Sequence, residues 1–144
     1  MGRYKKLVST KVSDITRNIK QYEGKRFKYI VRIYDITETR DYYKILCCSD
    51  NGDGFIEGSE MSILFSKEIL KGSELIEYDW IKIYGEIKGL YTYTTIENCK
   101  KTVPHMNVEK LKIFGSHFTL LLKSLVKISL IFLILYIINF SFLS

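Results

Sequence analysis

Oxygen-bearing side chains with the spacing of a calcium-binding loop occur in the stretch SDNGDGFIEGSE, which runs from residue 49 to residue 60. A glycine stands at the sixth position, Gly54, where such a loop turns sharply. Ser49 takes the first position, where an aspartate is usual, so the site would lose a charge. A calcium loop of this kind also needs a helix on each side. The ligands would include Asn51, Asp53, Glu57 and Glu60.

The same stretch has a second interpretation, as the connection of a β-hairpin. Its flanks, YYKILCC and MSILFS, are rich in residues that favour strands. Asn51-Gly52 and Asp53-Gly54 would then supply the positive φ angles that a hairpin turn requires. We favour the hairpin and keep calcium binding as the alternative.

Cysteines and histidines do not form a catalytic or metal-binding pattern in this sequence. Cys47 and Cys48 are adjacent and Cys99 stands alone, so the spacing of a zinc site is missing. His105 and His117 lie far from any cysteine or carboxylate motif. We find no phosphate-binding loop and no pair of catalytic acids. The sequence therefore predicts a protein that is not an enzyme and that needs no metal or other cofactor.

Tyrosines, lysines and arginines form a set of residues that suits nucleic acid, because aromatic rings stack on bases and cationic side chains attract phosphates. The charge distribution opposes this, since residues 33–99 carry a net charge of −7 between flanks of +8 (residues 1–32) and +5 (residues 100–144). Folding would have to gather the basic side chains onto one patch. Otherwise the tyrosines serve packing. The candidate binding residues are Arg32, Tyr34, Tyr43, Lys44, Lys82, Tyr84, Tyr91 and Tyr93.

Short strands must position these side chains, because apolar and polar residues alternate along much of the chain. We expect five or six strands, with one helix inserted between the third and the fourth. This order predicts a mainly β fold, a small closed barrel with a short amphipathic helix in front of it. The expected elements are a helix over residues 9–22, strands over 27–34, 42–48, 61–66 and 79–87, a short helix or turn over 67–76, an extended arm over 90–96 and a last strand over 106–113.

Several motifs resemble those of a known family. YEGK follows the predicted helix, GLYTYTT follows the fourth strand, and TVP precedes the last strand. In this combination the chain resembles the OB-fold proteins of the tRNA-anticodon-binding-like group, especially small bacterial members, over about residues 12–113. The resemblance implies a five-stranded OB-type β-barrel, a fold that commonly binds single-stranded nucleic acid across its second and third strands. The matching positions are Tyr22, Gly24, Lys25, Gly85, Gly89, Tyr91, Tyr93, Val103 and Pro104.

The end of the sequence, residues 118–144, is almost wholly apolar, and its only charges are Lys123 and Lys127. Residues 128–144 alone would form a helix of about 25 Å, less than the roughly 30 Å of a hydrocarbon core. The whole segment is long enough if both lysines reach the headgroups at the membrane interface, which their long side chains allow. We therefore predict one transmembrane helix over residues 118–143. A buried helix of a soluble bundle and an interfacial helix are the alternatives.

Lysines precede this apolar segment and none follows it, so the positive-inside rule puts the N-terminal part of the chain in the cytoplasm. The first ten residues lack the apolar run of a signal peptide. We expect a single-pass membrane protein with a C-terminal tail anchor. Its parts are a basic N-terminal segment with the amphipathic helix (1–23), the OB-fold barrel (24–115) and the transmembrane helix (118–143).

Two functions follow from these expectations. The first, which we favour at this point, is a non-enzymatic OB module that recruits a protein, a peptide or a small ligand at the inner face of the membrane. The second is a membrane-tethered protein that binds single-stranded nucleic acid. The partners implied are the lipid bilayer and, beyond it, a protein or a single-stranded nucleic acid.

Overall fold

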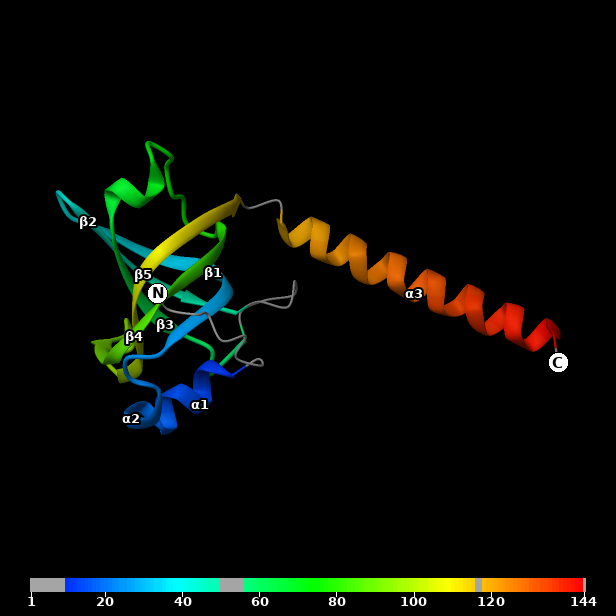
Figure 1. The fold of residues 1–144 in the computed structure, drawn as a ribbon, viewed down its shortest axis with the longest axis horizontal. Coiled ribbons are helices and arrows are strands. Elements are labelled where there is room, and N and C mark those ends of the chain that lie inside the picture. Colours follow the sequence, from blue (N-terminus) through cyan, green and yellow to red (C-terminus); the bar gives the residue numbers. More distant parts are fainter. Residues whose placement is uncertain (1–9, 50–55, 116–117, 144) are drawn as a thin grey trace.

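The computed structural model describes residues 10–49, 56–115 and 118–143. It shows a β-barrel with short helices against it and one long helix that leaves the barrel (Figure 1). The strands are β1 (Arg26–Glu38), β2 (Tyr42–Cys48), β3 (Met61–Ser66), β4 (Trp80–Thr94) and β5 (Lys100–Gly115), and the helices are α1 (Val12–Arg17), α2 (Ile19–Tyr22), the 3-10 helix η1 (Lys67–Leu70) and α3 (Phe118–Leu143).

The strands close into a barrel in the order β1-β2-β3-β5-β4. β1 pairs with β2 on one side and with β4 on the other, and this double pairing closes the ring. β3 and β5 pair in parallel, and the remaining neighbours are antiparallel. A closed five-stranded barrel that is covered by a short helix is an OB-type barrel, so the predicted fold class is confirmed.

Strands β4 and β5 pair along their whole length, from Trp80 opposite Gly115 to Thr94 opposite Lys100. The predicted strand over 79–87 and the predicted arm beyond it are therefore one strand, and the last strand starts earlier than predicted. Irregularities in register interrupt this pairing. Each irregularity disturbs the alternation of inward and outward side chains, which hid the continuity of both strands in the sequence.

β1 also runs further than predicted, to Glu38 instead of residue 34. Its first half pairs with β4, and its second half continues against β2 as far as Glu38 opposite Tyr43. The turn to β2 is held by Thr39, whose hydroxyl donates a hydrogen bond to the carbonyl of Tyr42 (3.0 Å). β2 and β3 have the predicted bounds.

The predicted N-terminal helix over residues 9–22 is two short helices, α1 and α2, and its residue 9 lies outside the described residues. The helices part at Asn18, whose φ of −123° is not helical. Val12 and Ile15 of α1 are buried in the same hydrophobic cluster as the side chains inside the barrel. The two helices therefore cover one end of the barrel, as Figure 1 shows.

Gly85 lets β4 and β5 approach closely at one of the irregularities in register. A Cβ atom added there would lie 2.1 Å from the backbone oxygen of Asn107, which leaves no room for a side chain. Gly85 is one of the positions on which the family resemblance rested. The structure gives its physical reason, which is the close passage of a neighbouring backbone.

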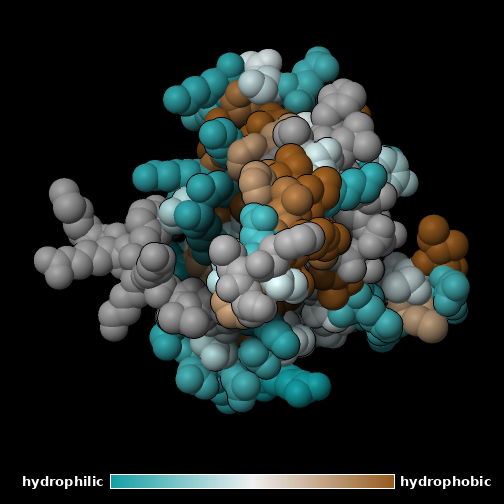
Figure 2. Space-filling model, turned by 90° about the vertical axis from the view of Figure 1, so that its right-hand side faces the viewer, coloured by the Kyte–Doolittle hydropathy of each residue, from teal (hydrophilic) through white to brown (hydrophobic). Residues whose placement is uncertain are grey.

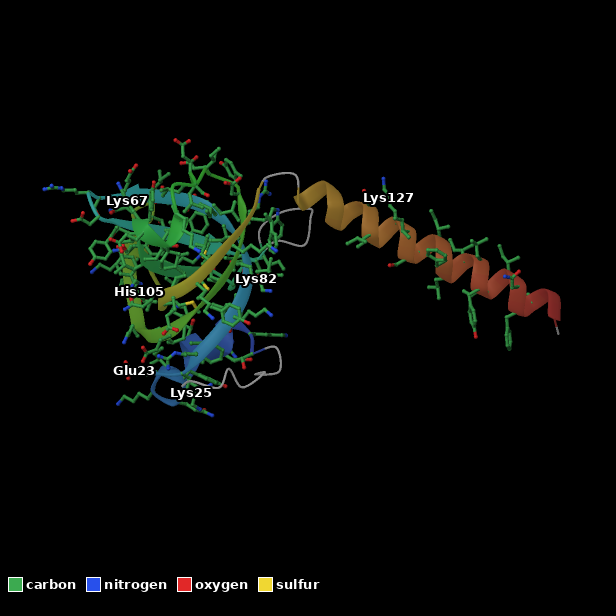
Figure 3. All side chains as sticks on the ribbon, turned by 45° about the horizontal axis from the view of Figure 1, so that its top comes forward. Glu23, Lys25, Lys67, Lys82, His105 and Lys127 are labelled. Carbon is green, nitrogen blue, oxygen red and sulfur yellow. The ribbon has the colours of Figure 1, made fainter. Side chains whose placement is uncertain are left out.

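Helix α3 has 26 residues and is about 39 Å long at 1.5 Å per residue. Its segment Ser124–Ser141 has a mean hydropathy of 2.0, and none of these residues is buried. The helix is therefore long and apolar enough to cross a bilayer. Seen from the side on which the helix projects, the helix is viewed nearly end-on, and its apolar side chains stand in front of a barrel with many hydrophilic groups (Figure 2). Lys127 lies about a third of the way along the helix (Figure 3), while the side chain of Lys123 lies outside the described residues.

Candidate functional site

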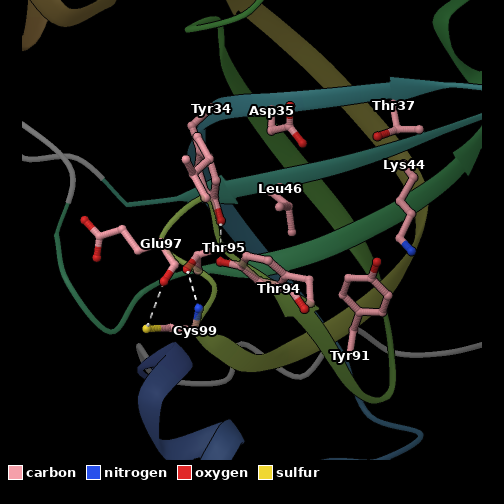
Figure 4. A pocket seen from close by; sticks show the side chains of 12 residues that line it. Tyr34, Asp35, Thr37, Lys44, Leu46, Tyr91, Thr94, Thr95, Glu97 and Cys99 are labelled. Atoms are coloured by element: carbon pink, nitrogen blue, oxygen red, sulfur yellow. Dashed lines mark hydrogen bonds between the residues drawn. The ribbon is translucent and has the colours of Figure 1, made fainter.

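A cleft of about 730 Å³ lies on the outside of the barrel, between the hairpin of β1 and β2 and the short connection from β4 to β5 (Figure 4). We refer to it as the tyrosine cleft. Parts of the chain that are far apart in sequence meet in it. Its lining residues are Tyr34, Asp35, Thr37, Lys44, Leu46, Tyr91, Tyr93, Thr94, Thr95, Ile96, Glu97 and Cys99.

Three tyrosines form a row along the cleft. Tyr91 and Tyr93 are two residues apart on β4 and so point to the same side of the strand. Their rings are nearly parallel, with an interplanar angle of 18° and 6.2 Å between centroids. The hydroxyl of Tyr93 shares a hydrogen bond of 2.9 Å with the hydroxyl of Tyr34 on β1. Burial, and next the bond to Tyr93, hold the pKa of Tyr34 well above its ordinary value, so this hydroxyl keeps its proton further into the alkaline range than a free tyrosine does.

Lys44 supplies a cation at one end of this row. Its ammonium nitrogen lies 3.6 Å from the centroid of the Tyr91 ring, a close cation–π contact. The imidazole of His105 also lies near Tyr91, with 6.1 Å between ring centroids. Burial lowers the pKa of His105, and the ammonium of Lys44 acts in the same direction. The imidazole is therefore neutral at physiological pH, and it shares a hydrogen bond of 3.0 Å with the hydroxyl of Ser62.

Carboxylates outnumber cations in the described lining of the cleft. Asp35 and Glu97 contribute one carboxylate each, and Lys44 contributes the ammonium. A site whose purpose was to hold several phosphates would show the opposite balance. The cleft is therefore an aromatic surface with mixed charges at its rim, which suits flat rings that carry hydrogen-bond donors.

No protein-family model and no well-characterised protein sequence matches this chain. Among solved structures, the mitochondrial single-stranded DNA binding protein Rim1 of S. cerevisiae is similar at 12% identity and a TM-score of 0.43, over 65% of this chain and 97% of that protein. The N-terminal domain of the PriB protein from Thermoanaerobacter tencongensis has 10% identity and a TM-score of 0.40, over 61% of this chain and 93% of that one. Aspartyl tRNA synthetase from Entamoeba histolytica has 13% identity and a TM-score of 0.47, over 80% of this chain and 23% of the synthetase. Sequence identities and TM-scores this low say nothing about what this chain binds.

The structure brings four of the eight predicted binding residues into the tyrosine cleft and leaves four outside it. Tyr43 precedes Lys44 and points to the other face of β2. Its ring packs against Phe65 with 5.8 Å between centroids, and the ammonium of Lys67 lies 5.3 Å from its centroid. Tyr43 therefore packs against the core cluster and does not line the cleft. The cleft residues among the eight are Tyr34, Lys44, Tyr91 and Tyr93.

Arg32, Lys82 and Tyr84 lie on a different part of the barrel surface, over β1 and β4. Arg32 donates a hydrogen bond from its Nε to the carbonyl of Tyr78 (3.0 Å). Tyr84 has the ammonium of Lys28 at 5.4 Å from its ring centroid. Residues that the sequence offered as one binding set are thus divided between the cleft, this second surface and, for Tyr43, a packing position against the core cluster.

Sequence reasoning missed the connection between β4 and β5, where Thr95, Ile96, Glu97 and Cys99 line the cleft. Thr95 and Cys99 close this turn, since the Thr95 N–H donates to the Cys99 carbonyl (2.8 Å) and the Cys99 N–H donates to the Thr95 hydroxyl (3.2 Å). Asn98 has a φ of 62°, which asparagine tolerates. The Glu97-Asn98 pair in a run of threonines and tyrosines was a turn signal. The other lining residues missed are Asp35, Thr37, Leu46 and Thr94.

The loop that resembled a calcium site connects two antiparallel strands, with Cys47 of β2 opposite Met61 of β3. The predicted hairpin connection is therefore confirmed, and strands stand where a calcium loop needs helices, while the turn residues Asn51-Gly52 and Asp53-Gly54 lie outside the described residues. Glu60 already accepts hydrogen bonds from the ammonium of Lys101 (2.6 Å) and from the N–H of Gly58 (3.1 Å). Within the described ranges no cluster of potential metal ligands occurs. Two of the proposed calcium ligands, Asn51 and Asp53, lie outside the described residues.

Proposed function

We propose that this chain is a membrane-anchored OB-fold protein that binds single-stranded nucleic acid in the tyrosine cleft. The observation that carries the proposal is the row of Tyr34, Tyr93 and Tyr91, with the ammonium of Lys44 at 3.6 Å from the centroid of the Tyr91 ring. Stacking of a base on an aromatic side chain is worth about 1–3 kcal/mol and tolerates any base. The cation beside the ring would attract a phosphate of the same strand.

The carboxylates of Asp35 and Glu97 give this binding a particular character. They repel phosphates, but they accept hydrogen bonds from exocyclic amino groups such as that of cytosine. The bases would then make most of the contacts, with the backbone of the strand passing near Lys44. Because a single phosphate contact contributes a slope of only about −0.7 to the dependence of log affinity on log salt concentration, we expect weak salt dependence.

Membrane anchoring in this proposal rests on α3, whose window Ser124–Ser141 is apolar and exposed. The positive-inside rule then orients the barrel toward the cytoplasm, since Lys127 and the lysines of β5 precede the uncharged part of the helix. We expect the full-length chain to stay with membranes after a carbonate wash. Protease added to sealed vesicles should cleave the barrel only when their cytoplasmic face is outside. Release by carbonate would contradict the anchor.

Recruitment of a protein, a peptide or a small ligand is the second candidate, and the excess of carboxylates in the cleft favours it. A basic side chain of a peptide would pair with Asp35 or Glu97, and an apolar neighbour would pack on Tyr91 and Leu46. Nucleic acid is the stronger proposal because the cleft presents nearly parallel rings beside a cation, which is the arrangement that stacked bases use.

Fluorescence anisotropy separates the two candidates. The full-length chain is inserted into nanodiscs of phosphatidylcholine, which has no net charge, and is titrated onto labelled DNA and RNA of about 12 nucleotides, within the site sizes of OB-folds. We expect single strands to bind about tenfold more tightly than duplexes of the same sequence, because paired bases cannot stack on Tyr91. Empty nanodiscs are the control. If no single strand binds, or if duplexes bind equally well, recruitment of a peptide or small ligand becomes the better account.

A further inference from the structure

Three neighbouring strands present lysines on a second surface of the barrel, away from the tyrosine cleft. Ile30 of β1 is paired with Lys82 of β4, and Lys82 is paired with Lys112 of β5, so these three residues form one row across the strands. Lys28 lies two residues before Ile30 on β1 and on the same side of the strand. We call Lys28, Ile30, Lys82 and Lys112 the basic face.

The lysines of the basic face are close enough to disturb one another. Hydrogen bonding and charge repulsion from Lys28 lower the pKa of Lys82, and Lys112 acts in the same direction. Ion pairs in the described part of the chain use other lysines and an arginine. The acidic residues of β4 and β5 are engaged elsewhere, since Glu86 pairs with Lys88 at 2.9 Å and Glu109 pairs with Arg26 at 3.0 Å. The positive charge of this face is thus not compensated by the carboxylates of β4 and β5.

Apolar and aromatic groups lie among these cations. Ile30 is 44% exposed, which is unusual for an isoleucine in the middle of a strand. The ammonium of Lys112 lies 5.6 Å from the ring centroid of Phe114, and that of Lys28 lies 5.4 Å from the ring of Tyr84. A mixture of ammonium groups, aromatic rings and an exposed aliphatic side chain is typical of surfaces that sit at a membrane–water interface.

The chain itself holds this face near the start of α3. β5 ends at Gly115 and α3 begins at Phe118, so Lys112 is separated from the helix by at most about 22 Å of fully extended chain. Lys82 lies on the side of the barrel from which α3 departs, while Lys67 and His105 lie on the far side (Figure 3). The tyrosine cleft uses Tyr91 and Tyr93, at the opposite end of β4 from Lys82.

We propose that the basic face docks on the anionic phospholipid headgroups of the bilayer that holds α3, so that the barrel lies against the membrane with its tyrosine cleft directed away from it. This inference rests on the membrane anchoring argued above, and it is independent of what the cleft binds. Phosphate oxygens would lie between the ammonium groups of Lys28, Lys82 and Lys112 and relieve their mutual repulsion. Ile30 would enter the headgroup region beside them.

A fluorophore at position 30 tests the proposal in the full-length chain. The substitution Ile30→Cys is made together with Cys99→Ser, because Cys47 and Cys48 are buried and Cys99 is the exposed cysteine of the described residues. The labelled protein is reconstituted into vesicles of phosphatidylcholine with or without phosphatidylserine, and quenching by a lipid with a nitroxide on its headgroup is measured. We expect at least about twofold stronger quenching with phosphatidylserine, and loss of the difference at high salt, where surface charges are screened.

Two comparisons make the result specific. A label on the native Cys99, beside the cleft, should show no dependence on phosphatidylserine. Lys28→Gln, Lys82→Gln and Lys112→Gln combined should remove the dependence at position 30, whereas Lys67→Gln and Lys88→Gln combined should preserve it. Equal quenching in both kinds of vesicle, or quenching that survives the triple substitution, overturns the proposal.

The test also distinguishes the failure of this inference from the failure of the anchor. A chain whose α3 does not span the bilayer will be released by a carbonate wash and will not float with pure phosphatidylcholine vesicles after it, whereas a correctly anchored chain will float after that wash whether or not the basic face docks. Slower modification of Lys28, Lys82 and Lys112 by an amine reagent on addition of single-stranded DNA, without any effect of phosphatidylserine, would assign the face to nucleic acid and overturn the lipid proposal.

Discussion

The ammonium nitrogen of Lys44 lies 3.6 Å from the centroid of the Tyr91 ring, although β2 and β4, which carry these residues, are not neighbours in the barrel. The contact bridges the two sides of the tyrosine cleft. It places the cation of the cleft over one face of the ring whose other face would stack on a base. Both residues therefore give sharp tests of the proposed function.

Tyr91→Ala should weaken the binding of single-stranded oligonucleotides about 5- to 150-fold, because one stacked base is worth about 1–3 kcal/mol. Tyr91→Phe retains the ring and should bind within about threefold of the unchanged protein. Tyr84→Ala, on the other surface of the barrel, is the matched control and should leave the affinity unchanged in fluorescence anisotropy. If Tyr84→Ala and Tyr91→Ala had equal effects, the cleft would not be the binding site.

Lys44→Gln should change the salt dependence of oligonucleotide binding. Removal of one phosphate contact makes the slope of log affinity against log salt concentration shallower by about 0.7. The measurement is a series of anisotropy titrations at increasing salt in phosphatidylcholine nanodiscs. An unchanged slope would mean that phosphate does not contact Lys44.

Tyr34→Phe should make the protein more resistant to alkali. Burial and the hydrogen bond with Tyr93 raise the pKa of Tyr34 in the folded state, so the folded state holds its proton more strongly than the unfolded state does. This contribution to the free energy of unfolding is complete below about pH 10, the ordinary pKa of tyrosine, and is lost as the pH rises above it. Tyr29, whose pKa is also raised mainly by burial, acts in the same way.

Urea unfolding followed by the fluorescence of Trp80, the single and buried tryptophan, checks this expectation. From about pH 10 upward the free energy of unfolding should fall more steeply for the unchanged protein than for Tyr34→Phe. Ultraviolet titration should show that Tyr34→Phe lacks one phenol that ionises above the ordinary tyrosine pKa in the unchanged protein. Identical pH profiles for the two proteins would contradict the assigned environment of Tyr34.

Gly85→Ala should destabilise the barrel by about 3 kcal/mol or more, since its Cβ would lie 2.1 Å from the backbone oxygen of Asn107. Gly58→Ala is the control, because Gly58 has a φ of 83° but no atom within 4 Å of an added Cβ. That variant should lose only the roughly 1–2 kcal/mol of a left-handed backbone conformation. Urea unfolding gives both values, and equal losses would show that β4 and β5 can separate at Gly85 without cost.

Calcium should not bind to the loop between β2 and β3. Its flanks are strands, and Glu60 is engaged by Lys101 at 2.6 Å. Titration calorimetry of the full-length chain with calcium at up to millimolar concentration should give only the heat of dilution. A saturable heat that disappears in the combined variant Glu57→Gln and Glu60→Gln would restore the calcium hypothesis.

Alternation of apolar and polar residues was sufficient to predict the strands whose pairing is regular. β2 and β3 have the predicted bounds, and Ile81 and Ile83 of β4 are fully buried, as their spacing implied. The prediction was incomplete where β4 passes Gly85 and Gly89. The register shifts there reverse the alternation of apolar and polar residues, so the sequence pattern wrongly indicates that the strand ends. The closer resemblance to the tRNA-anticodon-binding-like group stays a prediction.

The sequence by itself determined a mainly β chain, the class of barrel, the apolar helix near its end and the types of residue available for binding, because each of these follows from local periodicity, composition and motifs. The tertiary structure decided which of those residues act together. Tyr34, Lys44, Tyr91 and Glu97 meet only because β1 leaves β4 to pair with β2 and because β4 turns into β5 at residues 95–99. Arg32, Lys82 and Tyr84 are separated from them by the same closure of the barrel, which long-range pairing sets and no local pattern records.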